Sequence, residues 1–487
     1  MLYSLRQIAP ESKFCHLLHL DVFEQIIPVA LIREVLSQTQ SWEKRERDLN
    51  MVTVIVVIIA MSLLPCQSIA HVLQKIAGGL RSVWPDPCIK LPGASAISQR
   101  RRQLGVVPLR RLFERVCRPR ATAQTPGAFL FGLRLMAIDS TVENVPDSFA
   151  NALTFGRPSS QHGPAAYPQV RGIYLIECAT HLIVDALFRP HRPNEQQGAW
   201  ALLRSVQRGM LVLLDRGFHS ARLIQVMRAL GAHVLGRLAS NVAPRYLRQL
   251  GDGSYLAYLY PEDDSGKQQG RPLLVRIIEY TLDDPHRPGH GELHRLVTTL
   301  LTPRTCPAKE LVRCYHERWE IEGAIDEVDT HQRLCQSTLR SQTPQGIEQE
   351  LYGVLLAYYA VRALMLQAAQ PLGLDSDRLS FTHAITVVTD AVPQFQQTAR
   401  VQHEALFERL LADLRTPLLP ARRLRSNPRV CKRPGSKFPR PCPQDRQVPK
   451  LERTFAEIIV LLTQSTRYHE PQPIKRFKRI QRIVLLI

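Results

Sequence analysis

The chain has 487 residues and carries 63 Lys and Arg against 43 Asp and Glu, a formal net charge of +20. Apolar residues make up 45% of it, so the composition excludes a disordered polycation and predicts folded domains, about three at roughly 150 residues each. The excess of positive charge favours a polyanionic partner, with nucleic acid ahead of an anionic membrane surface.

The ten cysteines are spread along the chain, and no two form a Cys-x-x-Cys pair. Zinc sites need closely spaced thiolate or imidazole ligands, so this spacing argues against a structural zinc ion. We expect free, mostly buried thiols in a reducing compartment, which predicts a cytoplasmic protein. Met1 to Lys13 has no basic region followed by an apolar core, so we expect no secretory signal.

Apolar residues recur at helical spacing through residues 1–122, which predicts an all-helical N-terminal region. Its most apolar segment, Met51–Leu64, has 14 residues and stops at Pro65. Because a membrane span needs about 20 apolar residues, this pattern favours a buried core helix over a membrane helix. We expect no membrane association.

Basic residues gather at the end of this helical region. Between Arg100 and Arg120 there are eight arginines against Glu114, and Arg100, Arg101 and Arg102 are consecutive. Such a run is often a solvated helix face. Its excess of positive charge here favours a helix that contacts DNA phosphates.

The pattern changes to strands after about residue 130. In chain order, apolar runs predict strands at 133–138, 170–178, 181–188, 210–214 and 233–238, and helical spacing predicts helices at 194–208 and 220–230. Ala179 and Thr180 leave only a tight connection between the second and third strands, which predicts a hairpin. Strands that are first paired and then alternate with helices predict a mixed α/β sheet.

The second half begins with a turn-rich region at 241–304, where short β-like runs predict a β insertion into the α/β domain. We expect one long helix over 308–329 and an apolar helix over 346–369. Residues 421–450 hold ten basic residues, one acid and six prolines, which predicts an extended segment that attracts polyanions.

Two acids stand where α/β sheets usually place function. Asp139 and Asp215 each follow a short apolar strand at its carboxyl end. A third acid, Glu322, shares one face of the long helix with Tyr315 and Arg318, because these residues fall at i, i+3 and i+7. Carboxylates suit hard divalent cations, and a guanidinium suits a phosphate, so the set points to phosphoryl transfer.

Spacing alone leaves other choices open. Glu143, Asp147 and Asp326 are equally admissible acids, and helical i, i+3, i+7 sets are often surface salt bridges. The neighbouring Trp319 is as suited to a core contact as to stacking on a base.

The sequence motifs resemble those of insertion-sequence transposases with an Asp-Asp-Glu active site, in the IS-four family with its Tyr-Arg-Glu-Lys signature. That signature is Tyr, two residues, Arg, three residues, Glu, six residues, Lys. Tyr315, Arg318 and Glu322 match it at the family spacing within CYHERWEIEGAIDE. The family's two aspartates are similar in context to Asp139 in MAIDSTVENVPDS and Asp215 in LLDRGFHS.

The similarity covers roughly residues 25–440. It includes WEKRERDLN and ASAISQRRRQLG in the helical N-terminal region, RLVTTLLTP at the end of the insertion, QELYGVLLAYYAVRALM after the signature, and the basic PRVCKRPGSKFPR. The resemblance implies a ribonuclease-H-like catalytic domain with a β-strand insertion, preceded by an all-α N-terminal domain and followed by a helical and basic C-terminal region. The corresponding domains would be 1–122, 123–370 with the insertion at about 241–304, 371–420, and a basic tail at 421–487.

The resemblance also implies a chemistry. Asp139, Asp215 and Glu322 would hold Mg²⁺, with Mn²⁺ as a substitute, and Tyr315 and Arg318 would contact phosphates near the cleaved bond. The activity would be cleavage at the terminal inverted repeats of the element, followed by attack of the freed 3′-hydroxyl on target DNA. The partner is double-stranded DNA, and paired ends imply a dimer in the complex.

The chain departs from the family pattern at Asp329, which stands where the family has Lys. A negative charge there repels phosphate, so we expect weakened activity or a decaying copy. About 45 residues after Arg440 match nothing in the family and suggest a readthrough extension. Two further readings follow: a ribonuclease-H-like nuclease without strand transfer, and an inactive relative that only binds DNA.

Overall fold

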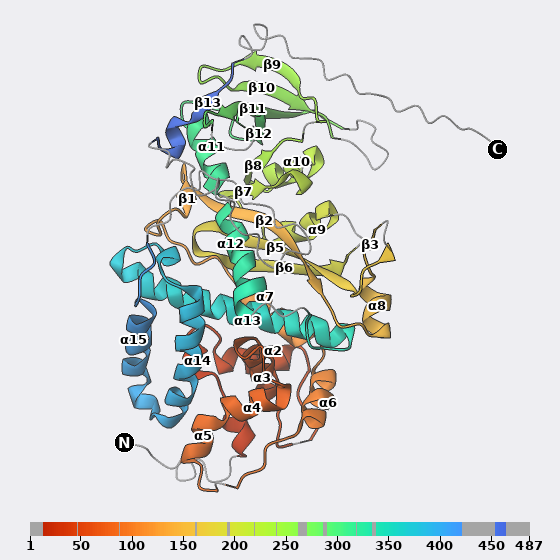
Figure 1. Ribbon diagram of the computed structural model, residues 1–487, viewed down its shortest axis with the longest axis vertical. Helices are drawn as coiled ribbons and strands as arrows, with labels where there is room; N and C mark the ends of the chain where they lie inside the picture. Colours follow the sequence, from red (N-terminus) through yellow and green to blue (C-terminus); the bar gives the residue numbers. More distant parts are fainter. Residues whose placement is uncertain are drawn as a thin grey trace, which may run out of the picture.

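The computed structural model describes residues 13–463 apart from several gaps (Figure 1). The gaps are 46, 87, 161–162, 192–194, 219, 240, 262–269, 286–289, 318, 334–337 and 421–452. The sequence prediction for the extended basic segment at 421–450 therefore lies outside the described residues.

A group of helices forms one end of the molecule, as the N-terminal sequence predicts (Figure 1). The helices are α2 (Val29–Gln38), α3 (Met51–Leu63), α4 (Ile69–Ile76), α5 (Gly78–Val83), α6 (Ala94–Leu104) and α7 (Val107–Val116). Asn50 starts α3 because its side chain accepts a hydrogen bond from the backbone N–H of Thr53 at 2.8 Å. Every residue of α3 is buried, so the prediction of a core helix is confirmed.

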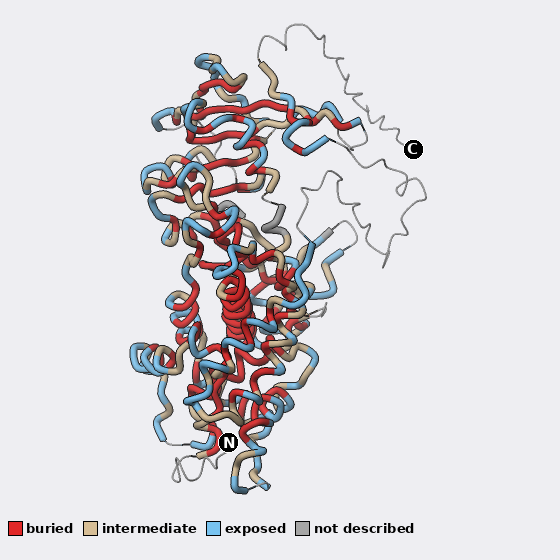
Figure 2. The backbone as a smooth tube through the Cα atoms, turned by 90° about the vertical axis from the view of Figure 1, so that its left-hand side faces the viewer, coloured by how far each residue is buried: buried red, intermediate tan, exposed pale blue. Residues whose placement is uncertain are grey.

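The long helix α13 (Pro344–Ala369) lies between the helical end and the sheet (Figures 1 and 2). It packs against α3. Gly353 lets the two backbones approach closely, since a Cβ at this position would lie only 2.7 Å from the carbonyl oxygen of Ile58. In the described part of the chain, the segment Pro344–Leu372 is long and apolar enough to cross a membrane by length and composition. Its most apolar window is 94% buried inside the protein, as in a core helix.

The middle of the molecule is a mixed sheet. Its strands are β1 (Phe129–Leu130), β2 (Leu133–Asn144), β5 (Gln169–Glu177), β6 (Leu182–Pro190), β7 (Met210–Leu214) and β8 (His233–Arg237). The order is β6-β5-β2-β7-β8, with β5 antiparallel to β2 and β6, and β7 parallel to β2 and β8. The predicted hairpin and mixed sheet are confirmed.

The β insertion continues this same sheet instead of forming one of its own. Its strands are β9 (Arg245–Gln249), β10 (Tyr255–Leu259), β11 (Leu273–Leu282) and β12 (His294–Thr298). Strand β12 pairs with β8, which extends the order by β12-β11-β10-β9. The insertion therefore forms the opposite end of the molecule from the helices (Figure 1).

Smaller helices complete the structure. They are α8 (Phe149–Phe155), α9 (Glu195–Leu202), α10 (Ala221–Ala229), α11 (Ala308–Glu317), α12 (Trp319–Asp326), α14 (Phe381–Gln397) and α15 (His403–Leu414). The helix expected over 308–329 is described as α11 and α12 on either side of residue 318, and it becomes π-helical at Glu327–Gln332. Of the cysteines in the described ranges, seven are free thiols, and five of these are buried, as the sequence predicts.

Candidate active site

Asp139 and Asp215 lie at adjacent positions, on strand β2 and directly after the neighbouring strand β7. Strands β2 and β7 run parallel with Ile138 paired to Leu214, so each aspartate follows directly after the last pair. Both residues are half-buried. The sequence expectation of a strand ending at Asp139 was wrong for β2, which continues to Asn144 beside β5, but the pairing with β7 does end there.

Local hydrogen bonds hold both aspartates. The carboxylate of Asp139 accepts a hydrogen bond from the backbone N–H of Ser140 at 2.8 Å. Asp215 opens a short 3-10 turn, because its carbonyl accepts from the N–H of Phe218 at 3.1 Å and the Phe218 ring is buried. Ser220 then caps α10 through its side chain.

Tyr315 lies on α11 and reaches the same edge of the sheet. Its hydroxyl donates a hydrogen bond to the carbonyl of Leu214, at 3.4 Å, directly before Asp215. The side chain is only 5% exposed. This contact joins α11 to the end of β7, and the phosphate contact expected for Tyr315 stays a prediction.

Glu322 lies on α12, and its side chain is outside the described residues, as is all of Arg318. The backbone of Glu322 lies between two residues whose contacts with the sheet are described. It follows Tyr315 by seven residues and precedes Asp329 by seven, and each of these contacts the sheet beside one aspartate. Tyr315 bonds to Leu214, and Asp329 accepts from the hydroxyl of Thr141 at 2.8 Å.

The contacts of the π-helical segment extend along one face of β2. Asp139, Thr141 and Glu143 alternate along the strand and therefore share a face. Thr141 bonds to Asp329, and Glu143 forms a buried ion pair with Arg333. Glu143, an alternative acid by spacing, is thus committed to a structural pair. π-Helical turns often occur at functional sites.

Asp329 is the residue that replaces the family lysine. Burial raises the pKa of its carboxyl to about 6, with a contribution from the charge of Asp326, while the hydrogen bond from Thr141 opposes the rise. Its second oxygen, Oδ1, has no hydrogen-bond partner among the described residues. Near pH 6 the carboxyl is therefore partly neutral, which softens the repulsion of phosphate that the sequence predicts.

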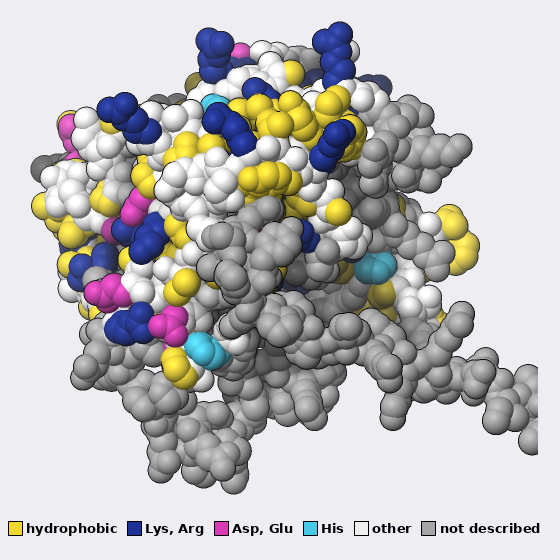
Figure 3. All heavy atoms as spheres, turned by 90° about the horizontal axis from the view of Figure 1, so that it is seen from above, with side chains coloured by type: hydrophobic (Ala, Val, Ile, Leu, Met, Phe, Trp, Pro, Cys, Tyr) yellow, Lys and Arg dark blue, Asp and Glu magenta, His cyan; other side chains and the backbone are white. Residues whose placement is uncertain are grey.

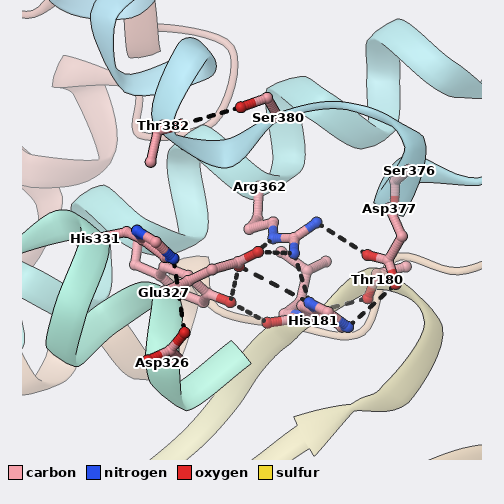
Figure 4. Close-up of polar contacts among 12 residues, drawn as sticks. Thr180, His181, Asp326, Glu327, His331, Arg362, Ser376, Asp377, Ser380 and Thr382 are labelled. Atoms are coloured by element: carbon pink, nitrogen blue, oxygen red, sulfur yellow. Dashed lines mark hydrogen bonds and ion pairs between the residues drawn. The ribbon is translucent and has the colours of Figure 1, made fainter. Parts of the chain in front are cut away.

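A buried charged network joins the π-helical segment to α13 (Figure 4). Arg362 of α13 donates to Glu327 at 2.8 Å through Nε and to Asp377 at 3.3 Å, and it also contacts His181 in the β5–β6 turn. Burial alone would raise the pKa of Glu327, but Arg362 and His181 outweigh it and lower that pKa to about 2. Sequence reasoning missed this network, although Arg362 is a lone charge in the apolar stretch YYAVRALM.

The donor set at the sheet edge fits a divalent cation. Carboxylate oxygens are the ligands that Mg²⁺ prefers, and such sites keep several waters. Within the described residues no three His, Cys, Asp or Glu side chains form a complete metal-binding group. The third carboxylate expected there, that of Glu322, lies outside the side chains described.

The three arginines expected to bind DNA have different surroundings. Arg101 is turned into the protein, where it donates to Ser341 and to the Gly346 carbonyl, each at 3.1 Å, and burial lowers its pKa. This contact joins α6 to the start of α13, and the phosphate contact expected for Arg101 stays a prediction. Arg102 is exposed. Arg100 bonds to Gln103 at 2.8 Å, and its Nη2 is buried with no partner among the described residues.

Comparisons with known proteins agree with this architecture. Residues 130–360 match the family model of the transposase DDE domain, and residues 17–114 match that of the insertion element 4 transposase N-terminal domain. The chain is 28% identical over 421 residues to the transposase InsG for insertion sequence element IS4 of Escherichia coli K12, covering 84% of this chain and 91% of InsG. It is 26% identical over 220 residues to the putative transposase InsZ of the same organism, covering 44% of this chain and 69% of InsZ.

Among solved structures, a piggyBac transposase in a synaptic complex with hairpin DNA matches with a TM-score of 0.39 and 12% identity, covering 85% of this chain and 87% of that one. The fold, the paired aspartates and the two family matches define a DDE transposase. The chain belongs to the insertion element 4 family of these enzymes and is an insertion-sequence transposase. Enzymes of the DDE family use a divalent metal ion.

Proposed function

We propose that Asp139, Asp215 and Glu322 are the catalytic carboxylates of this transposase and that they bind Mg²⁺, with Mn²⁺ as a substitute. The observation that carries the proposal is the pairing of Ile138 with Leu214, which sets two carboxylates side by side on parallel strands. The contacts of Tyr315 and Asp329 on either side of Glu322 support the third assignment.

The reaction we propose is cleavage at the terminal inverted repeats of the element, followed by strand transfer into target DNA. Asp139, Asp215 and Glu322 would hold the divalent cation, which would supply activation of the attacking oxygen and stabilisation of the leaving one. The sheet fixes the backbone of Asp139 and Asp215 and so orients their carboxylates. Tyr315 holds α11 against the end of β7, and Arg318 neutralises a phosphate beside the cleaved bond.

We propose that the N-terminal helices bind the ends of the element through a groove of about 1030 Å³ between residues 40–51 and 90–103. Lys44, Arg45, Arg47, Lys90 and Arg100 line it, against Glu43 and Asp48. The Nη2 of Arg100, which has no hydrogen-bond partner among the described residues, is a donor suited to a phosphate or a base edge. The excess of positive charge complements duplex DNA, so binding should weaken steeply with salt.

The opposite end of the molecule offers a second basic surface. Seen from above, Lys and Arg side chains stand among hydrophobic ones over the β insertion (Figure 3). The edge strand β9 exposes Arg245 and Arg248 beside Tyr246 and Leu247, of which the last two are 44% and 45% exposed. Basic and aromatic side chains together suit a nucleic-acid backbone and its bases. We propose that target or flanking DNA lies along this end.

The arrangement of domains follows from these assignments. The strand order β6-β5-β2-β7-β8 supports a ribonuclease-H-like catalytic domain at 123–370, interrupted by the β insertion. The helices of residues 1–122 would be the DNA-binding domain, and 371–420 a helical support packed on α13. Two ends must be joined during transposition, so we propose a dimer in the paired-end complex, acting in the cytoplasm.

The test is a cleavage assay with linear DNA that carries the element's ends. We expect Mg²⁺-dependent nicking at the ends and transfer of the cut strand into a second DNA. Nicking without transfer would support a nuclease instead. A shifted band with no cutting in Mg²⁺ or Mn²⁺ would support an inactive DNA-binding relative, which the replacement of Lys by Asp329 favours as the second candidate.

A further inference from the structure

The chain returns to the β insertion after the described residues of the helical end. Residues 453–463 form a short 3-10 turn, Phe455–Glu457, and the strand β13 (Ile459–Leu461). This C-terminal strap, as we name residues 453–463, lies beyond both regions that match the family models. The suggestion of a readthrough extension after Arg440 therefore has to be weighed against this folded segment.

Backbone hydrogen bonds join the strap to the insertion. Strand β13 is antiparallel to β11, with Tyr280 paired to Leu461 and Leu282 to Ile459. On either side of these pairs, the N–H of Asp283 donates to the carbonyl of Ile458 at 2.8 Å, and the N–H of Leu462 donates to that of Glu279 at 2.9 Å. The strap thus occupies the edge of β11 past the end of β10.

The sequence of the strap suits this conformation. Thr454 and Glu457 form a reciprocal capping box, in which each side chain satisfies a backbone N–H of the turn. Phe455 is 8% exposed, and Ile458 and Ile459 are buried, whereas Val460, which pairs with Thr281, is 41% exposed. Arg453 forms an ion pair with Asp283 at 2.9 Å. The helix cap, the apolar pattern and the strand pairing all favour the same conformation, as expected of a segment whose sequence specifies its fold.

The strap contacts the helix that carries the signature. The ring of Phe455 lies 4.6 Å from the ring of His316, next to Tyr315 at the end of α11. His316 Nε2 and the Tyr280 hydroxyl of β11 are 2.8 Å apart in a hydrogen bond. The end of α11 is therefore held from one side by Phe455 and β11, while Tyr315 bonds to Leu214 beside Asp215.

We propose that the strap is a positioning element of the active site and that Phe455 is the positioning residue within it. This inference rests on the proposed function of the site. By fixing the end of α11, Phe455 fixes the hydrogen bond from Tyr315 to Leu214 and the entry into α12, which carries Glu322. Loss of the contact lets the end of α11 shift, and since small misplacements of reacting groups are costly, cutting slows while DNA binding is kept.

The test compares four forms of the full chain: wild type, Phe455→Ala, the conservative Phe455→Leu, and the control Val460→Ser on the exposed face of β13. Cutting is measured at saturating end DNA, and the Kd for the same DNA by titration in Ca²⁺. We expect Phe455→Ala to cut at least tenfold more slowly with a Kd within twofold of wild type. Phe455→Leu should recover most of the rate, and Val460→Ser should match wild type.

A truncation after Glu452 and a peptide of residues 453–463 extend the test. Strand addition to the free edge of β11 by the peptide should restore cutting to the truncated protein. If the truncation does not fold, Phe455→Ala and Phe455→Leu still decide. Full-rate cutting by Phe455→Ala, or a lowered affinity with an unchanged rate, would overturn the proposal.

Hydrogen exchange tests the positioning role of Phe455 without a measurement of cutting. Should the wild type not cut DNA at all, the proposed function fails, but the strap is still tested by exchange in α11. We expect faster exchange in 308–317 for Phe455→Ala than for wild type or Val460→Ser. Equal exchange in all three would overturn the positioning role.

Discussion

The substitution Asp329→Asn removes a buried negative charge from the segment that faces β2. Burial raises the pKa of this carboxyl from 3.8 to about 6, so the folded protein prefers the protonated acid. The raised pKa begins to cost stability as the pH rises above 3.8, and the cost is complete above about 6. The full difference corresponds to about 3 kcal/mol at pH 8 and to about half of that at pH 5. An amide keeps the shape and can accept from Thr141.

We therefore expect Asp329→Asn to be more stable than wild type at pH 8, with an advantage that shrinks by about half at pH 5. The measurement is urea unfolding of both proteins across pH 5 to 8, compared at the transition that reports the catalytic region. The matched control is Asp390→Asn in α14, an exposed carboxylate. A difference between Asp329→Asn and wild type that stays constant across this range would refute the reasoning.

Three further predictions concern the site and its supports. Asp329→Lys restores the family residue and should raise cleavage of end-carrying DNA in vitro; an unchanged rate would remove the idea that Asp329 weakens the enzyme. Arg101→Ala should lower the free energy of unfolding by about 2 kcal/mol, because it leaves groups of Ser341 and Gly346 unpaired, whereas Arg102→Ala should weaken DNA binding and leave stability unchanged. Arg362→Met should cost about 3–5 kcal/mol, since Glu327 and Asp377 remain buried without their partner, while Arg409→Ala, an exposed pair with Asp413, should cost under about 1 kcal/mol.

Elements with strong local patterns were predictable from the sequence. The strand before Asp215 is a run of five buried apolar residues, and α3 and most of α13 are apolar, so their type and burial follow from composition. The neighbourhood of Asp139 and Asp215 also follows, because each comes after an apolar strand of a parallel pair.

Features that depend on long-range contacts were not predictable. The basic run at 100–102 looks uniform in sequence, yet Arg101 faces α13 and Arg102 faces outward, since helical rotation and the partner of α6 decide this. The buried network at Arg362 arises from packing between segments more than 100 residues apart, such as His181 and Arg362. The place of β13 depends likewise on a free edge of β11 that only the fold creates.

The most direct test of the central claim is cutting of end-carrying linear DNA by Asp139→Ala, Asp215→Ala and Glu322→Ala beside wild type in Mg²⁺. The DNA affinity of each protein is measured in parallel without catalysis. We predict that each variant loses cutting while it binds the DNA as tightly as wild type. Normal cutting by any one of the three would contradict the assignment of the active site.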